Sequence, residues 1–281
     1  MNYDWLFSFA VFADHLSFTR AATELHISQP SLHVQVRKLG DEVGRPLYRR
    51  SGRALVLTRE GEQVAAFARE IRERGAAMLE QVRGEAASSP VVLAAGHGAF
   101  VYLLGPAIRR FPKQTWTLRL ATMSAPATIA AVRDARAHLG VAAVVEPPTD
   151  LVATPIHRVG QHVVVPASHR LADRRTLRVD QLASEPLIVA PEGTPHRTML
   201  ASLFRAVGAE LAVAVEATGW DLVLQFVRYG VGIAIVNDFC PPPKGTVAIP
   251  LAGAPTIDYF LFERRGAAGR GVDALRRLIV T

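Results

Sequence analysis

The chain has 281 residues, of which 49% are hydrophobic, 7% aromatic and 20% charged, a composition that excludes a disordered or collagen-like chain and predicts roughly one to three globular domains. The 32 Lys and Arg residues exceed the 25 Asp and Glu residues, and the net charge of +7 favours a polyanionic or acidic partner. The single cysteine, Cys240, excludes an intramolecular disulfide. No apolar run approaches the roughly 20 residues of a membrane-spanning helix, and residues 1–12 lack the pattern of a secretory signal, so we expect a cytoplasmic protein with no membrane contact.

Basic residues gather near the N-terminus. Residues 15–59 carry eight basic and three acidic side chains, whereas residues 60–85 carry four arginines and six glutamates. The positive excess is therefore a local patch. Two interpretations are open at this point, a solvated basic face or a surface for nucleic acid.

The first 45 residues predict three short helices. The first two of these helices each have an apolar stripe with helical spacing, and the residues of the two stripes are Leu6, Phe9, Phe12, Leu16, Phe18, Ala21, Ala22 and Leu25. Ser17 is placed to cap the second helix and Ser28 the third, where Pro30 is tolerated in the first turn. Because only residues 26–28 separate these two helices, they predict a helix-turn-helix.

The third helix has two different faces. Leu32, Val36 and Leu39 lie on one side by the 3.6-residue period and are predicted to be buried. The opposite side carries polar, cationic and apolar groups suited to a DNA major groove, namely Pro30, Val34, Arg37 and Lys38, flanked by Ser31 and His33.

A hairpin is predicted directly after this helix. Residues 47–50 and 54–57 read as strands around the turn at 51–53, with Arg50 and Arg53 at the tip. Arginines at the tip of such a wing suit a minor groove or its phosphates.

These residues carry a family resemblance. The run Phe9-x-x-Phe12, Leu16-Ser17-Phe18-x-Arg20-Ala21-Ala22-x-x-Leu25-x-Ile27-Ser28-Gln29-Pro30-Ser31-Leu32, Val36-x-x-Leu39, Gly44-x-x-Leu47-Tyr48-x-Arg50 and Thr58-x-x-Gly61 resembles the LysR-type transcriptional regulators. The resemblance implies a winged helix-turn-helix domain (1–58), a dimerising linker helix (59–88) and a two-lobed effector-binding α/β domain similar to periplasmic solute-binding proteins (89–281). It also implies a homodimer or tetramer on a double-stranded DNA operator, with DNA contacts from Arg20, Gln29, Pro30, Ser31, His33, Val34, Arg37, Lys38, Arg50 and Arg53.

One departure from the family bears on base reading. Members usually have Ser followed by Arg or Lys where this chain has His33 and Val34. We therefore expect Arg37, Gln29 or His33 to carry more of the discrimination between bases.

The linker helix is predicted from Thr58, which caps it, with Glu60 and Glu62 near its positive end. Its apolar residues alternate at spacings of four and three, and we call them the apolar seam: Val64, Ala68, Ile71, Gly75, Met78 and Val82. A seam this short is also explained by packing on the core of its own chain. The family resemblance favours a dimer contact through Val64, Ala68, Ile71, Met78 and Val82.

From residue 91 onward, apolar strands alternate with amphipathic helices, and this predicts two parallel α/β sheets. The strand candidates are 91–95, 117–121, 140–145, 163–166, 187–190, 213–217, 233–236 and 259–262, and the helix candidates are 102–111, 127–137, 197–207, 220–228 and 273–280. By resemblance the chain crosses between lobes near His162 and returns near Ile249. This places lobe 1 at about 89–161 and 250–281, and lobe 2 at about 162–249.

Three turns after predicted strands are candidate effector loops, because open sheets bind ligands at strand ends where helices begin. They are residues 96–99, 122–125 and 191–196, and the candidate contacts are His97, Gly98, Ser124, Ala125, Thr194, His196 and Trp220. Plain alternatives exist, since Ser124 and Thr194 fit as helix caps, His97 and His196 as solvated loop residues, and Trp220 as a packing residue. Twenty basic against fourteen acidic side chains from residue 91 onward favour an anionic effector such as a small organic or aromatic acid.

Two rival functions are weighed against a ligand-controlled regulator that alters access of RNA polymerase. An enzyme with a DNA-binding appendage is disfavoured because no Gly-x-Ser-x-Gly, His-Glu-x-x-His, phosphate-loop or Cys-x-x-Cys motif occurs, and we expect no catalytic residue, metal or cofactor. An architectural DNA-binding protein explains the basic patch equally well but leaves the two-lobed domain without a role.

Overall fold

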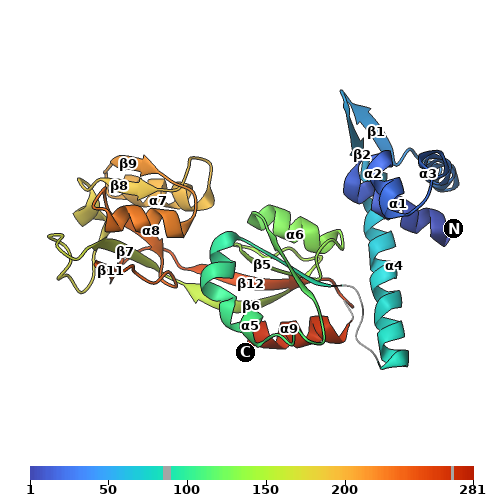
Figure 1. The fold of residues 1–281 in the computed structure, drawn as a ribbon. Coiled ribbons are helices and arrows are strands. Elements are labelled where there is room, and N and C mark those ends of the chain that lie inside the picture. Colours follow the sequence, from blue (N-terminus) through green and yellow to red (C-terminus); the bar gives the residue numbers. More distant parts are fainter. Residues whose placement is uncertain (85–89, 267–268) are drawn as a thin grey trace.

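The computed structural model of the chain describes residues 1–84, 90–266 and 269–281. A helical domain with a β-hairpin lies at the N-terminus, the long helix α4 (Arg59–Arg83) leaves it, and two α/β lobes follow (Figure 1). The predicted order of winged helix-turn-helix, linker helix and two lobes is confirmed. The predicted end of the linker helix, at residue 88, lies outside the described residues. No helix in the described ranges has the length and apolar character needed to cross a membrane.

The N-terminal domain is built on three helices, α1 (Tyr3–His15), α2 (Phe18–Glu24) and α3 (Gln29–Val43). Each begins at a side-chain cap, because Asn2, Ser17 and Ser28 accept hydrogen bonds from amides of the first turn. Phe9 of α1 and Leu32 of α3 are fully buried in the shared core. The helix-turn-helix prediction and both predicted caps are confirmed.

The predicted hairpin is also confirmed, as β1 (Tyr48–Ser51) and β2 (Ala54–Leu57), which pair antiparallel. Gly52 turns the chain with a positive φ of 60°, a conformation that favours glycine. At the base of the hairpin, a Cβ on Gly61 of α4 would lie only 1.8 Å from the carbonyl oxygen of Leu47. The close passage of α4 therefore requires glycine at this position and sets the direction of the wing.

Lobe 1 is a five-stranded sheet in the order β4-β3-β5-β12-β6. Its strands are β3 (Val91–Ala95), β4 (Leu118–Thr122), β5 (Leu139–Ala143), β6 (Val152–Val159) and β12 (Ile257–Glu263). Helix α6 (Ala125–Arg133) covers one face, and α5 (Gly105–Arg110) with α9 (Arg270–Val280) covers the other (Figure 1). A π-helical segment, η1 (Ala99–Leu103), follows β3. Alternate residues of β3 reach the two faces, Leu93 toward α9 and Ala94 toward α6.

Lobe 2 contains a three-stranded sheet in the order β10-β7-β11 and a separate pair, β8-β9. Its elements are β7 (Gln161–Pro166), η2 (Val179–Leu182), β8 (Leu187–Val189), α7 (Pro195–Ala206), β9 (Val213–Glu216), α8 (Trp220–Arg228), β10 (Ala234–Asn237) and β11 (Thr246–Pro250). Helices α7 and α8 pack in separate apolar clusters that contain alternate residues of β7, Val163 with α7 and Val164 with α8.

The expectation of two parallel sheets is wrong for four of the seven strand pairs in the two lobes. β3 is parallel to β4 and β5, and β8 to β9, but β12 is antiparallel to both of its neighbours, and so is β7. The physical reason is the crossing between lobes. β6 passes into β7 across Gly160, and β11 leads back to β12, so each sheet receives strands that run in opposite directions. Strands β6 and β11 were not predicted.

Candidate functional site

The two faces of α3 are oriented as predicted. Leu32, Val36 and Leu39 are 0%, 2% and 0% exposed, whereas Val34 on the opposite side is 41% exposed. Arg37 is also exposed and, within the described chain, forms no hydrogen bond or ion pair. The outward face of this helix is therefore free to meet a ligand.

The N-terminal turn of α3 is held by its own side chains. The Ser31 hydroxyl lies 2.8 Å from the Ser28 hydroxyl, and the Thr19 hydroxyl of α2 donates to Gln29 Oε1 at 3.3 Å. Ser31 and Gln29 are both exposed. Their polar atoms are fixed before any partner arrives, which reduces the entropy cost of a later contact.

Two further residues of the predicted DNA surface are restrained by contacts within the domain. The His33 ring stacks on Phe18 with centroids 3.6 Å apart and an interplanar angle of 15°. The Arg20 guanidinium donates to the backbone oxygen of His15 at 2.8 Å. Both side chains remain exposed, so these contacts orient them without covering them.

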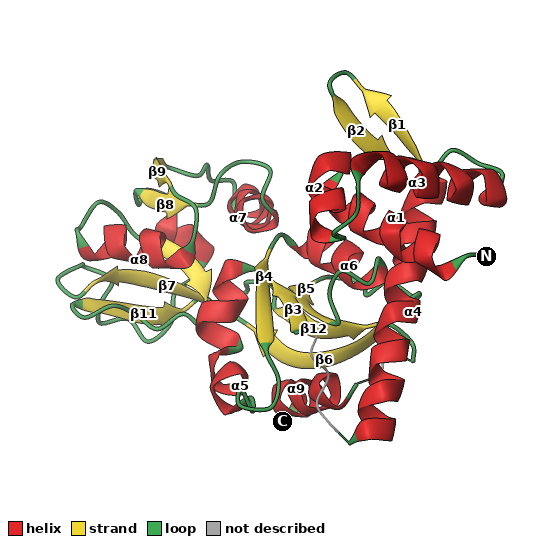
Figure 2. Cartoon of the chain, turned by 45° about the vertical axis from the view of Figure 1, so that its right-hand side comes forward, coloured by secondary structure: helices red, strands yellow, loops and turns green. Residues whose placement is uncertain are grey.

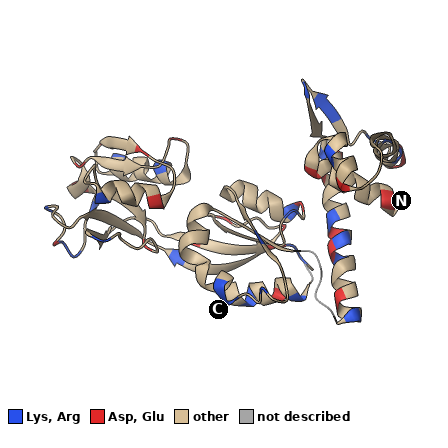
Figure 3. Cartoon of the chain, in the orientation of Figure 1, with Lys and Arg blue, Asp and Glu red and all other residues tan. Residues whose placement is uncertain are grey.

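Cations extend the surface beyond the helix. The Lys38 ammonium lies 5.3 Å from the centre of the Trp5 ring, a cation–π distance. Arg50 and Arg53 are exposed on the hairpin, where Figure 3 shows basic residues at the wing. An open hollow of ≈ 730 Å³ lies between α3 and the wing, with Arg37 and Arg45 among its lining residues. This shape and charge suit the sugar-phosphate backbone of a duplex.

The apolar seam of α4 divides into two parts. Val64 and Ile71 are half-buried against the core of the N-terminal domain, and Ala68 is fully buried in it. Met78 and Val82 are 54% and 74% exposed. The prediction of a dimer contact at Ala68 therefore needs correction, because its side chain already packs within its own domain; the exposed apolar part of the seam is its C-terminal half.

The other side of α4 carries a row of charges, Arg69, Glu73 and Glu80, which we call the charged stripe; it faces lobe 1 (Figure 2). Arg69, 6% exposed, donates to Asp14 of α1 at 2.6 and 3.1 Å and to the backbone oxygen of Asp134 at 3.1 Å. One guanidinium thus joins the N-terminal domain, the linker helix and lobe 1.

Glu73 lies at the centre of the charged stripe and pairs with Arg264 of lobe 1. Arg264 also donates to the backbone oxygens of Val132 and Ala137. Burial raises the pKa of Glu73, and Arg264 opposes that rise. His138 Nε2 lies 3.8 Å from Glu73 Oε1, and burial together with the charge of Arg264 lowers the pKa of His138 to about 4. The histidine is therefore neutral at pH 7.

Glu80 closes the charged stripe near the end of α4. It accepts from the Trp116 indole N–H at 3.0 Å and from the Arg270 backbone N–H at 3.1 Å. The Arg270 side chain in turn donates to the backbone oxygen of Gly84 at 3.3 Å. The linker helix is thus attached to lobe 1 along its last four turns.

Four of the predicted effector residues come together between the lobes. The Trp220 indole of lobe 2 lies so close to Gly98 of lobe 1 that a Cβ there would be 2.9 Å from the ring. The His196 ring meets Trp220 edge-on, with centroids 4.6 Å apart. His97 Nε2 lies 3.5 Å from Asp221 Oδ1, a second contact between the lobes. Trp220 therefore packs between the two lobes.

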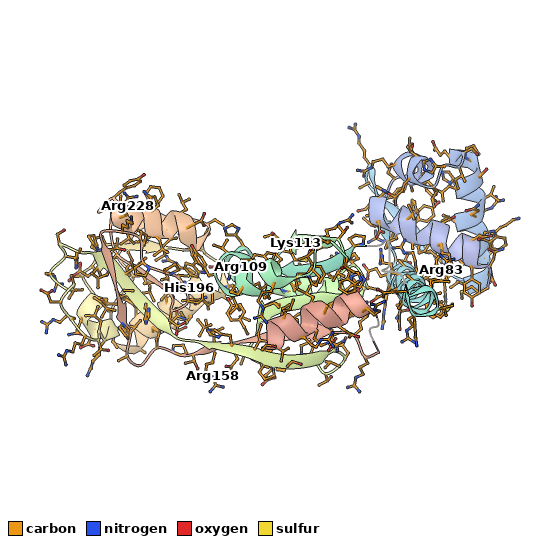
Figure 4. The ribbon with its side chains drawn as sticks, turned by 60° about the horizontal axis from the view of Figure 1, so that its bottom comes forward. Arg83, Arg109, Lys113, Arg158, His196 and Arg228 are labelled. Carbon is orange, nitrogen blue, oxygen red and sulfur yellow. The ribbon has the colours of Figure 1, made fainter. Side chains whose placement is uncertain are left out.

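His196 connects this site to a buried polar network. Its Nε2 lies 3.3 Å from Gln161 Oε1, and Gln161 donates to Asn237 Oδ1 at 3.1 Å. Among the described residues, the buried His196 Nδ1 has no hydrogen-bond partner. Burial lowers the pKa of His196 to about 4, so the ring is neutral at pH 7. In Figure 4, Arg158 and Arg228 project from the outer surface, away from His196.

The other predicted effector residues have local roles. Thr194 caps α7, accepting from the Arg197 amide at 3.4 Å. Ser124 is exposed at the start of α6, ahead of the half-buried Ala125, and within the described chain its hydroxyl makes no hydrogen bond. No hydrogen bond, ion pair or ring contact joins Ser124, Ala125 or Thr194 to Trp220 among the described residues.

Sequence reasoning missed the polar and aromatic groups at the crossing strands. Gln161 and Asn237 are buried there, and burial raises the pKa of Tyr259 to about 12. Tyr102 of η1 packs against the lobe 2 cluster, and burial, with Cys240 and Asp221 adding to it, raises its pKa. Gln161 lies next to a predicted crossing point, but that position does not show that these groups converge.

Two family matches cover nearly the whole chain. Residues 3–62 match the bacterial regulatory helix-turn-helix proteins of the lysR family, and residues 84–281 match the LysR substrate binding domain. The chain belongs to the LysR family. LysR proteins are transcriptional regulators with a DNA-binding helix-turn-helix and an effector-binding domain.

Named LysR relatives differ in what they regulate. The chain is 29% identical over 269 residues to the RuBisCO operon transcriptional regulator of Allochromatium vinosum. This match covers 92% of this chain and 88% of the relative. The chain is also 27% identical over 240 residues to the hydrogen peroxide-inducible genes activator of Dickeya chrysanthemi, and this match covers 83% of this chain and 77% of the relative.

Solved LysR structures share the fold along the full length. A cysteine-to-aspartate variant of full-length OxyR from Pseudomonas aeruginosa superposes with a TM-score of 0.79 at 22% identity, covering 99% of this chain and 94% of that one. Full-length CbnR in complex with its target DNA gives a TM-score of 0.62 at 19% identity, covering 99% of both chains. At these identities the likeness concerns the fold alone.

Proposed function

We propose that this LysR-family chain binds a specific operator in double-stranded DNA through α3 and the wing, and that a small molecule bound between the two lobes modulates this binding. The observation that carries the proposal is the orientation of α3, whose apolar residues are buried while Val34 and Arg37 face outward beside a basic wing. Operator binding changes the access of RNA polymerase to neighbouring genes. This activity on bacterial DNA places the protein in the cytoplasm.

The operator is the first thing to establish. Selection of bound fragments from a genomic pool, followed by fluorescence anisotropy at fixed salt, is expected to recover a site with two related half-sites, because a symmetric dimer places two α3 helices on one face of the duplex. Recovery of random fragments that all bind with one affinity would refute sequence-specific control and favour an architectural role.

The exposed part of the apolar seam is the proposed contact between two chains. Met78 and Val82 share a side of α4 that lobe 1 does not cover, and two such helices side by side would remove both from water. Met78→Glu is expected to shift the mass measured by sedimentation velocity toward the monomer. Leu222→Glu, at a residue 44% exposed on lobe 2, is the matched control and should leave the mass unchanged.

For the effector we propose a small organic or aromatic acid. The start of α7 at His196 and the start of α8 at Trp220 lie in contact, so the backbone amides of two helix N-termini are close to a neutral imidazole and an indole ring. The nearby carboxylate of Asp221 is 62% exposed and therefore screened by water. A thermal-shift screen of acids, neutral analogues and amines tests the class, and stabilisation by amines alone would refute it.

A further inference from the structure

A valine occupies the middle of the outward face of α3. Pro30, Val34 and Lys38 follow one another at four-residue spacing, with Arg37 beside them, and Val34 is 41% exposed. Partly buried apolar residues of α1, α3, the wing and α4 pack against the core of this domain. Val34 is not one of them. Its side chain therefore lies outside this core.

The polar groups on either side of Val34 are arranged around it. Ser31 is hydrogen-bonded to Ser28, and the His33 ring is stacked on Phe18. Arg37 is exposed and unpaired within the described chain. A partner that docks on this face thus meets an apolar centre within a polar and cationic frame.

The major groove offers one kind of apolar group on its floor, the C5 methyl of thymine, to which 5-methylcytosine is the chemical equivalent. The other groups that distinguish the base edges there are hydrogen-bond donors and acceptors, to which a valine side chain offers no partner. A valine at the centre of the reading face discriminates between bases only through such a methyl group.

We propose that Val34 reads the C5 methyl group of a thymine in each operator half-site, while Arg37 next to it supplies the polar contact to an adjacent base or phosphate. This inference rests on the proposed operator binding through α3. It assigns base discrimination at one position to an apolar contact instead of a charged one.

The test replaces each thymine of the selected half-site by deoxyuridine, one at a time, which removes only the methyl group. Anisotropy titrations at fixed salt are expected to show about fourfold weaker binding at one thymine, the effect of losing one buried methyl group. Val34→Ala should bind the thymine operator about as weakly and should no longer distinguish thymine from uracil at that position. Alanine has the highest helix propensity, so α3 is preserved.

Controls separate the possible results. Val145→Ala, at a residue 97% exposed on lobe 1, should keep the full response to the thymine replacement. If Val34→Ala keeps the same penalty at every replaced thymine, or if the wild-type protein shows no penalty anywhere, the assignment of Val34 is overturned while operator binding stands. If no specific operator can be selected, the proposed function itself fails.

Discussion

Replacing Arg264 by methionine would test how the linker helix is attached to lobe 1. The Arg264 side chain is 10% exposed and pairs with Glu73 of α4, whose side chain is 11% exposed. The same guanidinium donates to the backbone oxygens of Val132, in the last turn of α6, and of Ala137, beyond that helix. Methionine has a similar length and no charge, so the change removes the three polar contacts with little change in volume.

The expected loss in the free energy of unfolding is about 3–5 kcal/mol, because Arg264→Met leaves the Glu73 carboxylate buried without its partner. A double variant, Glu73→Leu with Arg264→Met, removes both charges and should be more stable than Arg264→Met alone by about 1–4 kcal/mol. It should remain below the wild type by about 1–2 kcal/mol, since the two carbonyl oxygens have still lost their donor.

Trp116 provides the assay, since its indole N–H donates to Glu80 of α4 at 3.0 Å. With Trp5 and Trp220 replaced by phenylalanine, Trp116 fluorescence during urea unfolding reports the contact between α4 and lobe 1 directly. Linear extrapolation gives the free energy of unfolding for each variant.

The matched control is Arg277→Met, at an exposed arginine in the last turn of α9, which should change stability by less than about 0.5 kcal/mol. A loss below about 1 kcal/mol for Arg264→Met would refute the reasoning. So would a double variant whose loss equals the sum of the two single losses, because the two charges would then be independent.

Three further outcomes are expected. In the double variant Arg50→Ala with Arg53→Ala, the slope of the logarithm of the DNA-binding constant against the logarithm of the salt concentration should become shallower by about 1 to 2. An unchanged slope in salt titrations would show that the wing does not contact DNA. Gly98→Ala should displace Trp220 and increase acrylamide quenching of its fluorescence, since the new Cβ would lie 2.9 Å from the ring; unchanged quenching would contradict the contact between the lobes. The pKa of His138 is about 4 when folded and near 6.5 when unfolded, so the unfolded chain binds the proton first and stability falls as pH drops through this window. Between pH 7.5 and pH 5 the contribution of this residue should fall by about 2 kcal/mol, and urea titrations should show a smaller pH effect in His138→Asn; equal pH effects in both proteins would count against the neutral buried imidazole.

Local signals explain why the N-terminal domain was predictable. Ser17 and Ser28 cap the helices that follow them, and Pro30 fits the first turn of α3, all within four residues of the positions they determine. The burial of Leu32 and Val36 follows from spacing alone, because one face of a helix must be covered. These features need no information from distant parts of the chain.

The sheets and the effector site depend on contacts that spacing does not reveal. β6 contains Pro155 and is half-exposed, so it lacks a strand-like alternation, and its partner β12 begins about a hundred residues later, pairing Ile257 with Val159. Gly98 lies in a predicted loop, but its contact with Trp220 exists only once the two lobes have come together. Gln161 carries no signal beyond its position at a crossing strand.

The two sides of α4 explain how one helix serves two purposes. By the 3.6-residue period, the charged stripe of Arg69, Glu73 and Glu80 lies roughly opposite the exposed Met78 and Val82. Lobe 1 therefore occupies one side while the apolar side stays open to a second chain, and neither contact has to break for the other to form. The residues of the charged stripe form directional hydrogen bonds with lobe 1. When lobe 1 shifts, we therefore expect α4 to move with it, because sliding of the helix along the lobe would break these bonds. We therefore expect an effector between the lobes to change the angle between the two α3 helices of a dimer, and not to release α4 from lobe 1.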